Sequence, residues 1–301
     1  MTRYRVTHRT SYRYGLAVND AYTVACLLPR DRDFQQVNSA RVTTTPAPDE
    51  FVETRDVFGN RIVQLGVHHR HDAFEISAQS VVDTHVPAVP TTTQPWEDVA
   101  AAARGLRDAS ATKIGPYRAL TQASTPAHRP ELLAALANRV FPPRRPVVEG
   151  VAALSREIFD TYTFDGTATD WATPLDTVLE KQRGVCQDFA HLATAVLRWV
   201  GLPASYVSGY IETEPPPGEV KSIGADASHA WCSVWTGPDE QGGGWLDLDP
   251  TNDQVPPTRH VTVGWGRDYA DVAPVRGVVL GPGSNQLMDV AVDVTRLSAD
   301  P

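Results

Sequence analysis

The first third of the chain alternates apolar and polar residues with a period of two. From Arg3 to about His85, runs such as Tyr4-Arg5-Val6-Thr7-His8-Arg9 are separated by turn residues. Such alternation is typical of strands that bury one face and expose the other. Val57-Phe58-Gly59-Asn60 lies between two of these runs and predicts a hairpin turn. We therefore expect an antiparallel β-sandwich of about six strands within residues 1–90.

The pattern changes after a segment rich in proline and threonine. Residues 87–95 (PAVPTTTQP) suit neither a helix nor a central strand and mark a domain boundary. Residues 91–145 then read as a helical connecting segment, with helical stretches that end near Gly115 and at Phe141. One further helix is predicted because four apolar residues share a single helix face. Another is predicted to begin at the cap Thr173-Pro174 and to continue to about Lys181. The four residues are Val147, Val151, Leu154 and Ile158.

Residues 183–201 (RGVCQDFAHLATAVLRWVG) form the most regular helical pattern in the chain. Their apolar residues recur at the spacing of one buried helix face, and glycines mark both ends. Cys186 is thereby placed in the first turn. Unpaired N–H groups and the positive end of the helix dipole favour a thiolate at that position.

Three short alternating strands follow, over residues 204–211, 228–235 and 244–249. In the second strand Cys232 points away from His229, so Cys232 is assigned to the core. Pairing Trp235 with Trp245 places Asp249 diagonal to His229, about 7–8 Å away between backbones, and Asp247 farther along the strand. A register slipped by two residues would place Asp249 directly opposite His229. Both registers favour Asp249 over Asp247 as the partner of His229.

A helix-borne cysteine, a strand-borne histidine and a carboxylate at a strand end are the parts of a thiol acyl-transfer site. His229 would remove the thiol proton, Cys186 would attack a carbonyl, and Asp249 would orient the imidazole. The backbone N–H of Cys186 is a natural oxyanion donor. A second donor is needed, and Gln182 and Trp171 are both candidates.

These segments resemble the core of the transglutaminase-like superfamily. The resemblance rests on residues 183–211, on residues 228–235 (SHAWCSVW) and on residues 244–252 (GWLDLDPTN). Residues 266–277 (GRDYADVAPVRG) and the N-terminal β domain are similar to its bacterial branch. The resemblance implies a papain-like core with Cys186 as nucleophile, His229 as base and Asp249 as orienting residue.

The expected fold class is therefore α+β, with the N-terminal antiparallel β-sandwich followed by the papain-like core. We place the transglutaminase-like catalytic core at residues 146–281. A C-terminal strand is expected within residues 282–301.

The composition limits which partners we expect the protein to bind. The chain has 27 basic and 36 acidic residues and a formal net charge of −9, which opposes binding to nucleic acid or to an anionic membrane surface. Three widely spaced cysteines cannot form a disulfide framework and indicate a reducing compartment. With neither a signal-peptide pattern nor a long apolar run, we expect a cytoplasmic protein.

Other conspicuous residues have structural interpretations. His191 is on a different face of the helix from Cys186 and reads as a packed or hydrogen-bonding residue. Asp188 suits the helix N-terminus or a loop contact. His68, His69 and His71 read as a solvated strand rather than a metal cluster. Tryptophans at such positions are more often core residues, although those on the side of His229 could line an acyl cleft. They are Trp231, Trp235 and Trp245. No metal, calcium loop or cofactor is expected.

The expected substrate is a peptide or protein with an amide acyl donor. Water as the second reactant would give a peptidase or amidase, whereas an amine acceptor would give transamidation, and the same three residues serve both. Hydrolysis is slightly favoured. The alternative is a non-catalytic or partner-dependent peptide-binding module on the same fold. The sequence does not set the oligomeric state.

Overall fold

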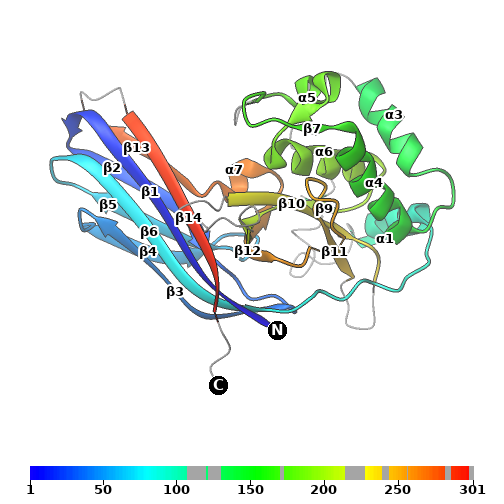
Figure 1. Ribbon diagram of the computed structural model, residues 1–301, viewed down its shortest axis with the longest axis horizontal. Coiled ribbons are helices and arrows are strands. Elements are labelled where there is room, and N and C mark those ends of the chain that lie inside the picture. The colour runs from blue at the N-terminus through cyan, green and yellow to red at the C-terminus, as the bar shows by residue number, and fades with distance from the viewer. Residues whose placement is uncertain are drawn as a thin grey trace, which may run out of the picture.

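The computed structural model describes residues 1–106, 120, 130–169, 173–213, 228–238, 244–255, 257–281 and 286–297. Figure 1 shows a β-sandwich and a mixed helical and sheet core lying side by side. Residues 85–94, which form neither helix nor strand, connect them. The α+β fold class expected from the sequence is confirmed. The predicted end of a helical stretch near Gly115 lies outside the described residues.

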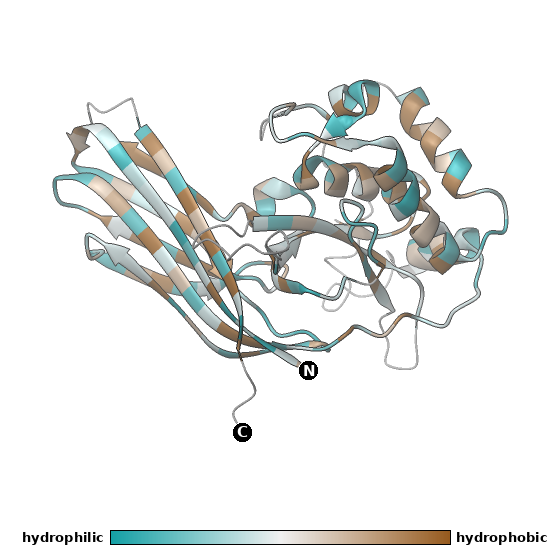
Figure 2. Ribbon diagram, viewed as in Figure 1, coloured by the Kyte–Doolittle hydropathy of each residue, from teal (hydrophilic) through white to brown (hydrophobic). Residues whose placement is uncertain are grey.

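The six strands expected at the N-terminus are present. Within them, Tyr4, Val6 and His8 are buried whereas Arg5 and Arg9 are exposed, as the alternation predicted. Figure 2 shows the corresponding apolar and polar bands along the long strands. The strands are β1 (Thr2–Val18), β2 (Asp20–Leu28), β3 (Gln35–Thr45), β4 (Glu50–Arg55), β5 (Arg61–Val67) and β6 (His71–Thr84).

The predicted hairpin joins β4 and β5. The two strands pair antiparallel, with Arg55 opposite Arg61. Gly59 lies in the connecting turn with φ +78°, a conformation that glycine adopts without a Cβ penalty. The hairpin therefore closes across residues 56–60, which include the four residues indicated by the sequence.

The two C-terminal strands return to the sandwich. Strand β13 (Val275–Leu280) pairs with β2, and β14 (Gln286–Leu297) pairs with β1. The sandwich thus consists of two four-stranded sheets, ordered β14-β1-β6-β3 and β13-β2-β5-β4. Strand β13 falls within residues 146–281, the range expected for the catalytic core, but it pairs with the sandwich and not with the sheet of the core. Edge pairing over a long sequence separation is not visible in local periodicity.

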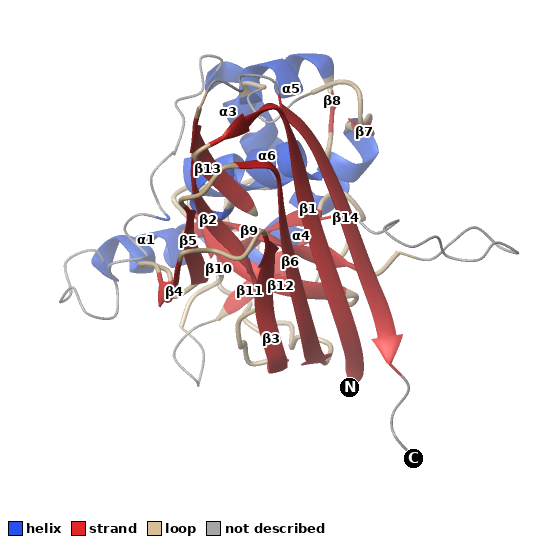
Figure 3. Ribbon diagram, turned by 90° about the vertical axis from the view of Figure 1, so that its left-hand side faces the viewer, coloured by secondary structure: helices blue, strands red, loops and turns tan. Residues whose placement is uncertain are grey.

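Helices surround one side of the core, behind the sandwich in Figure 3. Helix α4 buries Val147, Val151, Leu154 and Ile158 completely, the face that the sequence predicted. The longer helices are α1 (Trp96–Leu106), α3 (Pro130–Val140), α4 (Val147–Thr161) and α6 (Cys186–Trp199), and the shorter ones are α5 (Leu175–Lys181) and α7 (Tyr269–Val272). None of the described helices has the length and apolar character needed to cross a bilayer.

The core sheet has the strand order β11-β10-β9-β12 and packs against α6. Its strands are β9 (Ala204–Ile211), β10 (Ser228–Trp235), β11 (Trp245–Leu248) and β12 (His260–Gly266). Trp235 lies opposite Trp245, and Ser233 opposite Asp247, so the register derived from the sequence is the one observed. A short parallel pair, β7 (Thr163–Phe164) with β8 (Arg183–Gly184), fixes the chain just before α6.

Sandwich and core share a hydrophobic cluster. Its members come from β1, β2, β5, β6 and β14 on one side, and from α6, β9, β10, β12 and α7 on the other. Tyr4 and Val294 represent the sandwich, and Tyr206 and Val261 the core. Burial of apolar surface therefore holds the two parts together.

Candidate active site

Cys186 is the first residue of α6 and is partly exposed. Asp188 fixes the start of the helix, because its Oδ2 accepts hydrogen bonds from the Val185 backbone N–H at 2.8 Å and from the Thr169 hydroxyl at 2.6 Å. A Cβ at Gly184 would lie 2.7 Å from the same carboxylate, so this cap requires glycine. The cap places the Cys186 sulfur and N–H in the first turn, where backbone N–H groups have no intrahelical partner.

His229 lies near the start of β10 and is buried. Gly209 is its partner on β9. A Cβ at Gly209 would come within 2.6 Å of the Trp231 ring, so the missing side chain lets this indole cover β9. Trp231 in turn stacks near the His229 imidazole, with ring centroids 6.2 Å apart. Cys232 points to the opposite side and accepts a contact from the Thr194 hydroxyl at 3.3 Å, consistent with a core residue.

Asp249 begins a tight turn that directly follows β11. Its Oδ1 accepts the Thr251 backbone N–H at 3.0 Å, and its Oδ2 accepts the Asn252 side-chain amide at 2.7 Å. These local bonds hold the fully buried carboxylate in one orientation. Residues 249–252 (DPTN) thus fix the orientation of the Asp249 carboxylate.

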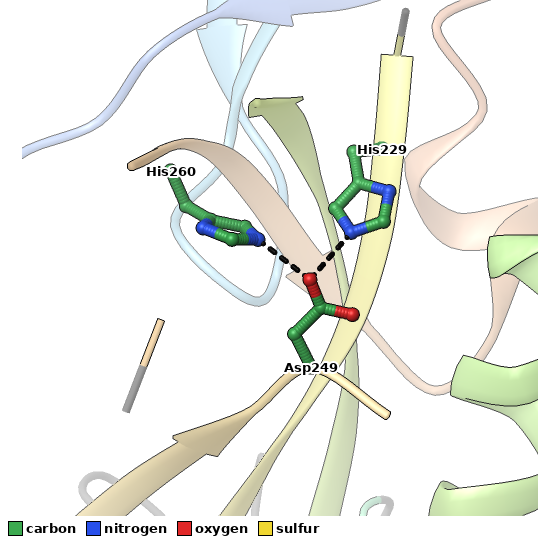
Figure 4. Close-up of side chains that lie close together, drawn as sticks. All are labelled: His229, Asp249 and His260. Carbon is green, nitrogen blue, oxygen red and sulfur yellow. Dashed lines mark hydrogen bonds and ion pairs between the residues drawn. The ribbon is translucent and has the colours of Figure 1, made fainter. Parts of the chain in front are cut away.

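The structure brings Cys186, His229 and Asp249 together. His229 Nε2 is 2.8 Å from Asp249 Oδ2, as Figure 4 shows. Burial opposes a charge on His229, but hydrogen bonds to Asp249 and to the Cys186 side chain outweigh it and raise the pKa of His229 to about 10. Burial likewise acts to raise the pKa of Asp249, yet hydrogen bonds from His229 and His260 hold it well below its ordinary value. An imidazolium between a carboxylate and the sulfur is the favoured state.

A second histidine contacts the same carboxylate and was not found from the sequence. His260 is the first residue of β12, and its Nε2 is 2.9 Å from Asp249 Oδ2 (Figure 4). Thr262 and His229 both pair with Gly209, from opposite sides of β9. His260 therefore reaches Asp249 only because β12 pairs with β9. The local sequence holds no signal for that pairing.

Asp247 has a different partner. Burial acts to raise its pKa, but two hydrogen bonds from the Arg32 guanidinium, at 2.6 and 3.0 Å, outweigh burial and lower the pKa. Asp247 also accepts the Trp231 indole N–H at 3.0 Å. The two carboxylates of this segment are thereby separated, Asp249 toward the histidines and Asp247 toward the sandwich.

The other residues singled out in the sequence are His191 and the two residues expected to be oxyanion donors. His191 accepts the Tyr269 backbone N–H at 3.1 Å, and burial lowers its pKa to about 4. Gln182 ends α5 in a left-handed conformation with an exposed side chain, and its backbone N–H donates to Val178. Trp171, the other proposed oxyanion donor, lies outside the described residues.

Two of the three histidines His68, His69 and His71 lie in a loop. His68 and His69 are in the connection between β5 and β6 rather than on a solvated strand as expected, and only His71 begins β6. His68 Nδ1 contacts Asp20 and His69 Nδ1 contacts Asp49, both at 3.1 Å. Proximity of carboxylates from other strands explains these contacts, which the local pattern could not predict.

Only one cluster within the described ranges offers three potential metal ligands close together. It consists of His229, Asp249 and His260, whose ligand atoms lie within 4.8 Å of one another. Zinc ligands at about 2.0–2.1 Å from the ion would be separated by about 3.3 Å. The observed 2.8 and 2.9 Å separations are those of hydrogen bonds, so the geometry fits a proton-sharing network better than a metal centre.

A cavity of about 840 Å³ lies between the sandwich and the core. Its volume is in the range of ligand pockets, and Asp247 forms part of its wall. Through Asp247 and Trp231 this wall connects to the surroundings of His229. The aromatic side chains lining the cavity are Phe34, Phe58, Trp245 and Trp265.

Comparison with known proteins identifies the family. Residues 4–83 match the bacterial transglutaminase-like N-terminal region, and residues 134–250 match the transglutaminase-like superfamily. The chain belongs to the transglutaminase-like superfamily. An uncharacterized protein of Mycobacterium tuberculosis H37Rv is 42% identical over 304 residues, covering 99% of this chain and 94% of the relative. An uncharacterized protein of Mycobacterium leprae is 35% identical over 303 residues, covering 99% and 100%.

A solved structure shows the same fold. It is a candidate cysteine protease from Cytophaga hutchinsonii, 21% identical to this chain, with a TM-score of 0.71 and coverage of 99% of this chain and 92% of that one. The match extends over both the sandwich and the core. The arrangement of the two parts is therefore common to these two proteins.

Proposed function

We propose that this protein catalyses cysteine-dependent acyl transfer on amide bonds of peptides or proteins. The observation behind this proposal is the position of His229, whose ring bonds to Asp249 through one nitrogen and interacts with the side chain of Cys186. A buried imidazole that links a thiol to a carboxylate is the arrangement required to activate a sulfur nucleophile.

In the first half-reaction the Cys186 thiolate attacks the amide carbonyl carbon. A carbon–sulfur bond forms, and the tetrahedral intermediate collapses as the carbon–nitrogen bond breaks. The His229 imidazolium donates its proton to the leaving nitrogen, so ammonia or an amine departs and a thioester remains. Asp249 keeps the ring oriented and stabilises its charge. The Cys186 backbone N–H donates to the developing oxyanion.

In the second half-reaction neutral His229 removes a proton from water or from an amine as it attacks the thioester carbonyl. The carbon–sulfur bond breaks and the thiolate returns. Water gives hydrolysis, and an amine gives a new amide. We favour hydrolysis, because the related fold from Cytophaga hutchinsonii is described as a candidate cysteine protease.

The test is mass spectrometry of the protein incubated with glutamine-containing peptides, with and without a small primary amine. Backbone cleavage identifies a peptidase, loss of ammonia an amidase, and an amine adduct a transamidase. Cys186→Ala should abolish every product, whereas Cys26→Ala, at a buried cysteine of the sandwich, should retain them. Turnover by Cys186→Ala would exclude Cys186 as the nucleophile.

A further inference from the structure

Two histidines from different strands share one carboxylate oxygen. Asp249 Oδ2 is 2.8 Å from His229 Nε2 and 2.9 Å from His260 Nε2, and Asn252 donates to the same oxygen at 2.7 Å (Figure 4). His260 has 4% of its side chain exposed, and the Asp249 side chain is fully buried. Hydrogen bonds in such a dry site are stronger than in water and influence one another.

The second nitrogen of each ring distinguishes the two histidines. The His229 side chain also interacts with Cys186. His260 Nδ1 is buried and has no hydrogen-bond partner among the described residues. Protonating His260 would place a donor at Nδ1 with nothing there to accept it, a costly arrangement. His260 is therefore neutral, with its proton on Nε2 directed at Asp249.

The charged and titratable groups that act on His260 come from two strand segments. Asp249 and Asp247 come from the β11 segment and His229 from β10, and His229 in turn interacts with Cys186 at the start of α6. Arg32 neutralises Asp247. Trp231 lies edge-on to the His260 ring, with centroids 4.9 Å apart, and fixes its plane. Burial lowers the pKa of His260, and the bond to Asp249 offsets this only in part.

We propose that His260 is a positioning residue that shares Asp249 with His229 and thereby limits the basicity of His229. This inference rests on the proposed acyl-transfer function. Asn252 and the two histidines compete for the charge of one oxygen, so each bond is weaker than it would be alone. A general acid is most effective when its pKa is near the working pH, and His229 already lies above that range. Without His260, Asp249 would hold the His229 proton more tightly and slow its transfer to the leaving group.

The test compares His260→Leu with His260→Gln. Leucine fills similar space without a donor, whereas the glutamine amide reaches about as far as Nε2 and donates. His260→Leu should lower kcat by about ten-fold or more with little change in KM, and should shift the alkaline limb of the kcat/KM profile to higher pH. His260→Gln should restore both. If His260→Leu does not fold, His260→Asn, whose amide is too short to reach Asp249, replaces it.

The matched control is His8→Leu. His8 is a buried histidine of β1 whose pKa is also lowered by burial, to about 4, and it bonds to Thr10 and Tyr210 rather than to Asp249. This variant should leave kcat and the alkaline limb unchanged. The inference would be overturned if His260→Leu lowered kcat without moving the alkaline limb of the kcat/KM profile. It would also be overturned if His260→Gln failed to restore kcat, and His260 would then be a packing residue.

A second readout needs no substrate. Imidazole NMR titration of the intact protein should show His229 losing its proton at higher pH in His260→Leu than in the wild type. If this shift occurs but the wild type turns over no amide, the proposed function fails and the sharing of Asp249 stands. If the wild type turns over amides and no shift occurs, the proposed function stands and the role of His260 fails.

Discussion

Arg32 of the sandwich and Asp247 of the core form a buried bidentate ion pair, with nitrogen–oxygen distances of 2.6 and 3.0 Å. Only 10% of the Arg32 side chain and 3% of the Asp247 side chain are exposed. Asp247 also bonds to Trp231, which stacks near His229. The β domain is thus attached to the sheet that carries the candidate catalytic residues by a directed polar contact as well as by apolar burial.

Removal of Arg32 should destabilise the whole protein. In Arg32→Ala the Asp247 carboxylate stays buried without its cation, which typically costs about 3–5 kcal/mol of unfolding free energy. Arg61→Ala is the matched control, because Arg61 pairs with the more exposed Glu53 and should cost about 1 kcal/mol or less. Urea denaturation measures both. Equal losses in the two variants would contradict the importance of the buried pair.

The two carboxylates should differ in their effect on activity. Asp249→Asn removes the charge that stabilises the His229 imidazolium and should lower kcat/KM by about 10²–10⁴. Asp247→Asn should destabilise the fold but change kcat/KM per folded molecule by less than about ten-fold. Steady-state kinetics with circular dichroism as a check on folding decides the matter. The reverse order would show that the wrong acid has been chosen.

The three cysteines should differ in reactivity. Burial raises the pKa of both Cys26 and Cys232 to about 12, and their side chains are almost inaccessible. Cys186 is partly exposed at a helix N-terminus beside His229. Iodoacetamide near neutral pH, followed by peptide mapping, should label Cys186 first. Slow labelling at all three positions would instead favour the non-catalytic peptide-binding module.

Protonation of His229 should contribute to stability in a defined pH window. Its pKa is raised from 6.5 to about 10 on folding, so the contribution is complete below about pH 6.5 and is lost as the pH rises through 10. Over that interval the unfolding free energy of the wild type should fall by about a few kcal/mol more than that of His229→Gln.

His191→Gln is the control for this pH effect. The pKa of His191 is lowered to about 4 in the folded state, so above about pH 7.5 His191 is neutral in both states and its replacement should leave the slope there unchanged. Denaturant unfolding across the interval supplies the measurement. A wild-type slope matching that of His229→Gln would mean that His229 gains no proton affinity on folding.

Local sequence was sufficient for much of the site. The periodicity of residues 183–201 predicted α6 and the position of Cys186 in its first turn. Pairing of Trp235 with Trp245 gave the correct register, and that register placed Asp249 rather than Asp247 near His229. Side-chain alternation and helical spacing determine such features within a few residues, so they can be derived from sequence.

Features that depend on strand order could not be derived in this way. His260 approaches Asp249 because β12 pairs with β9, and Arg32 meets Asp247 across a separation of 215 residues. The addition of β13 to β2 likewise joins distant segments. Periodicity describes which face of an element is buried, but it does not specify the neighbour that buries it.

The return of β13 and β14 makes the core an insertion within a discontinuous β domain. Both connections of the core lead to the same rigid scaffold, one through residues 85–94 and the other through the segment before β13. Hinge rotation about a single linker is therefore prevented. Cutting the chain before β13 would also uncover the edges of β1 and β2, which can template intermolecular pairing. Separating the core from the sandwich would leave a β domain prone to aggregation through its open edges, and a core without the strands that pack against it.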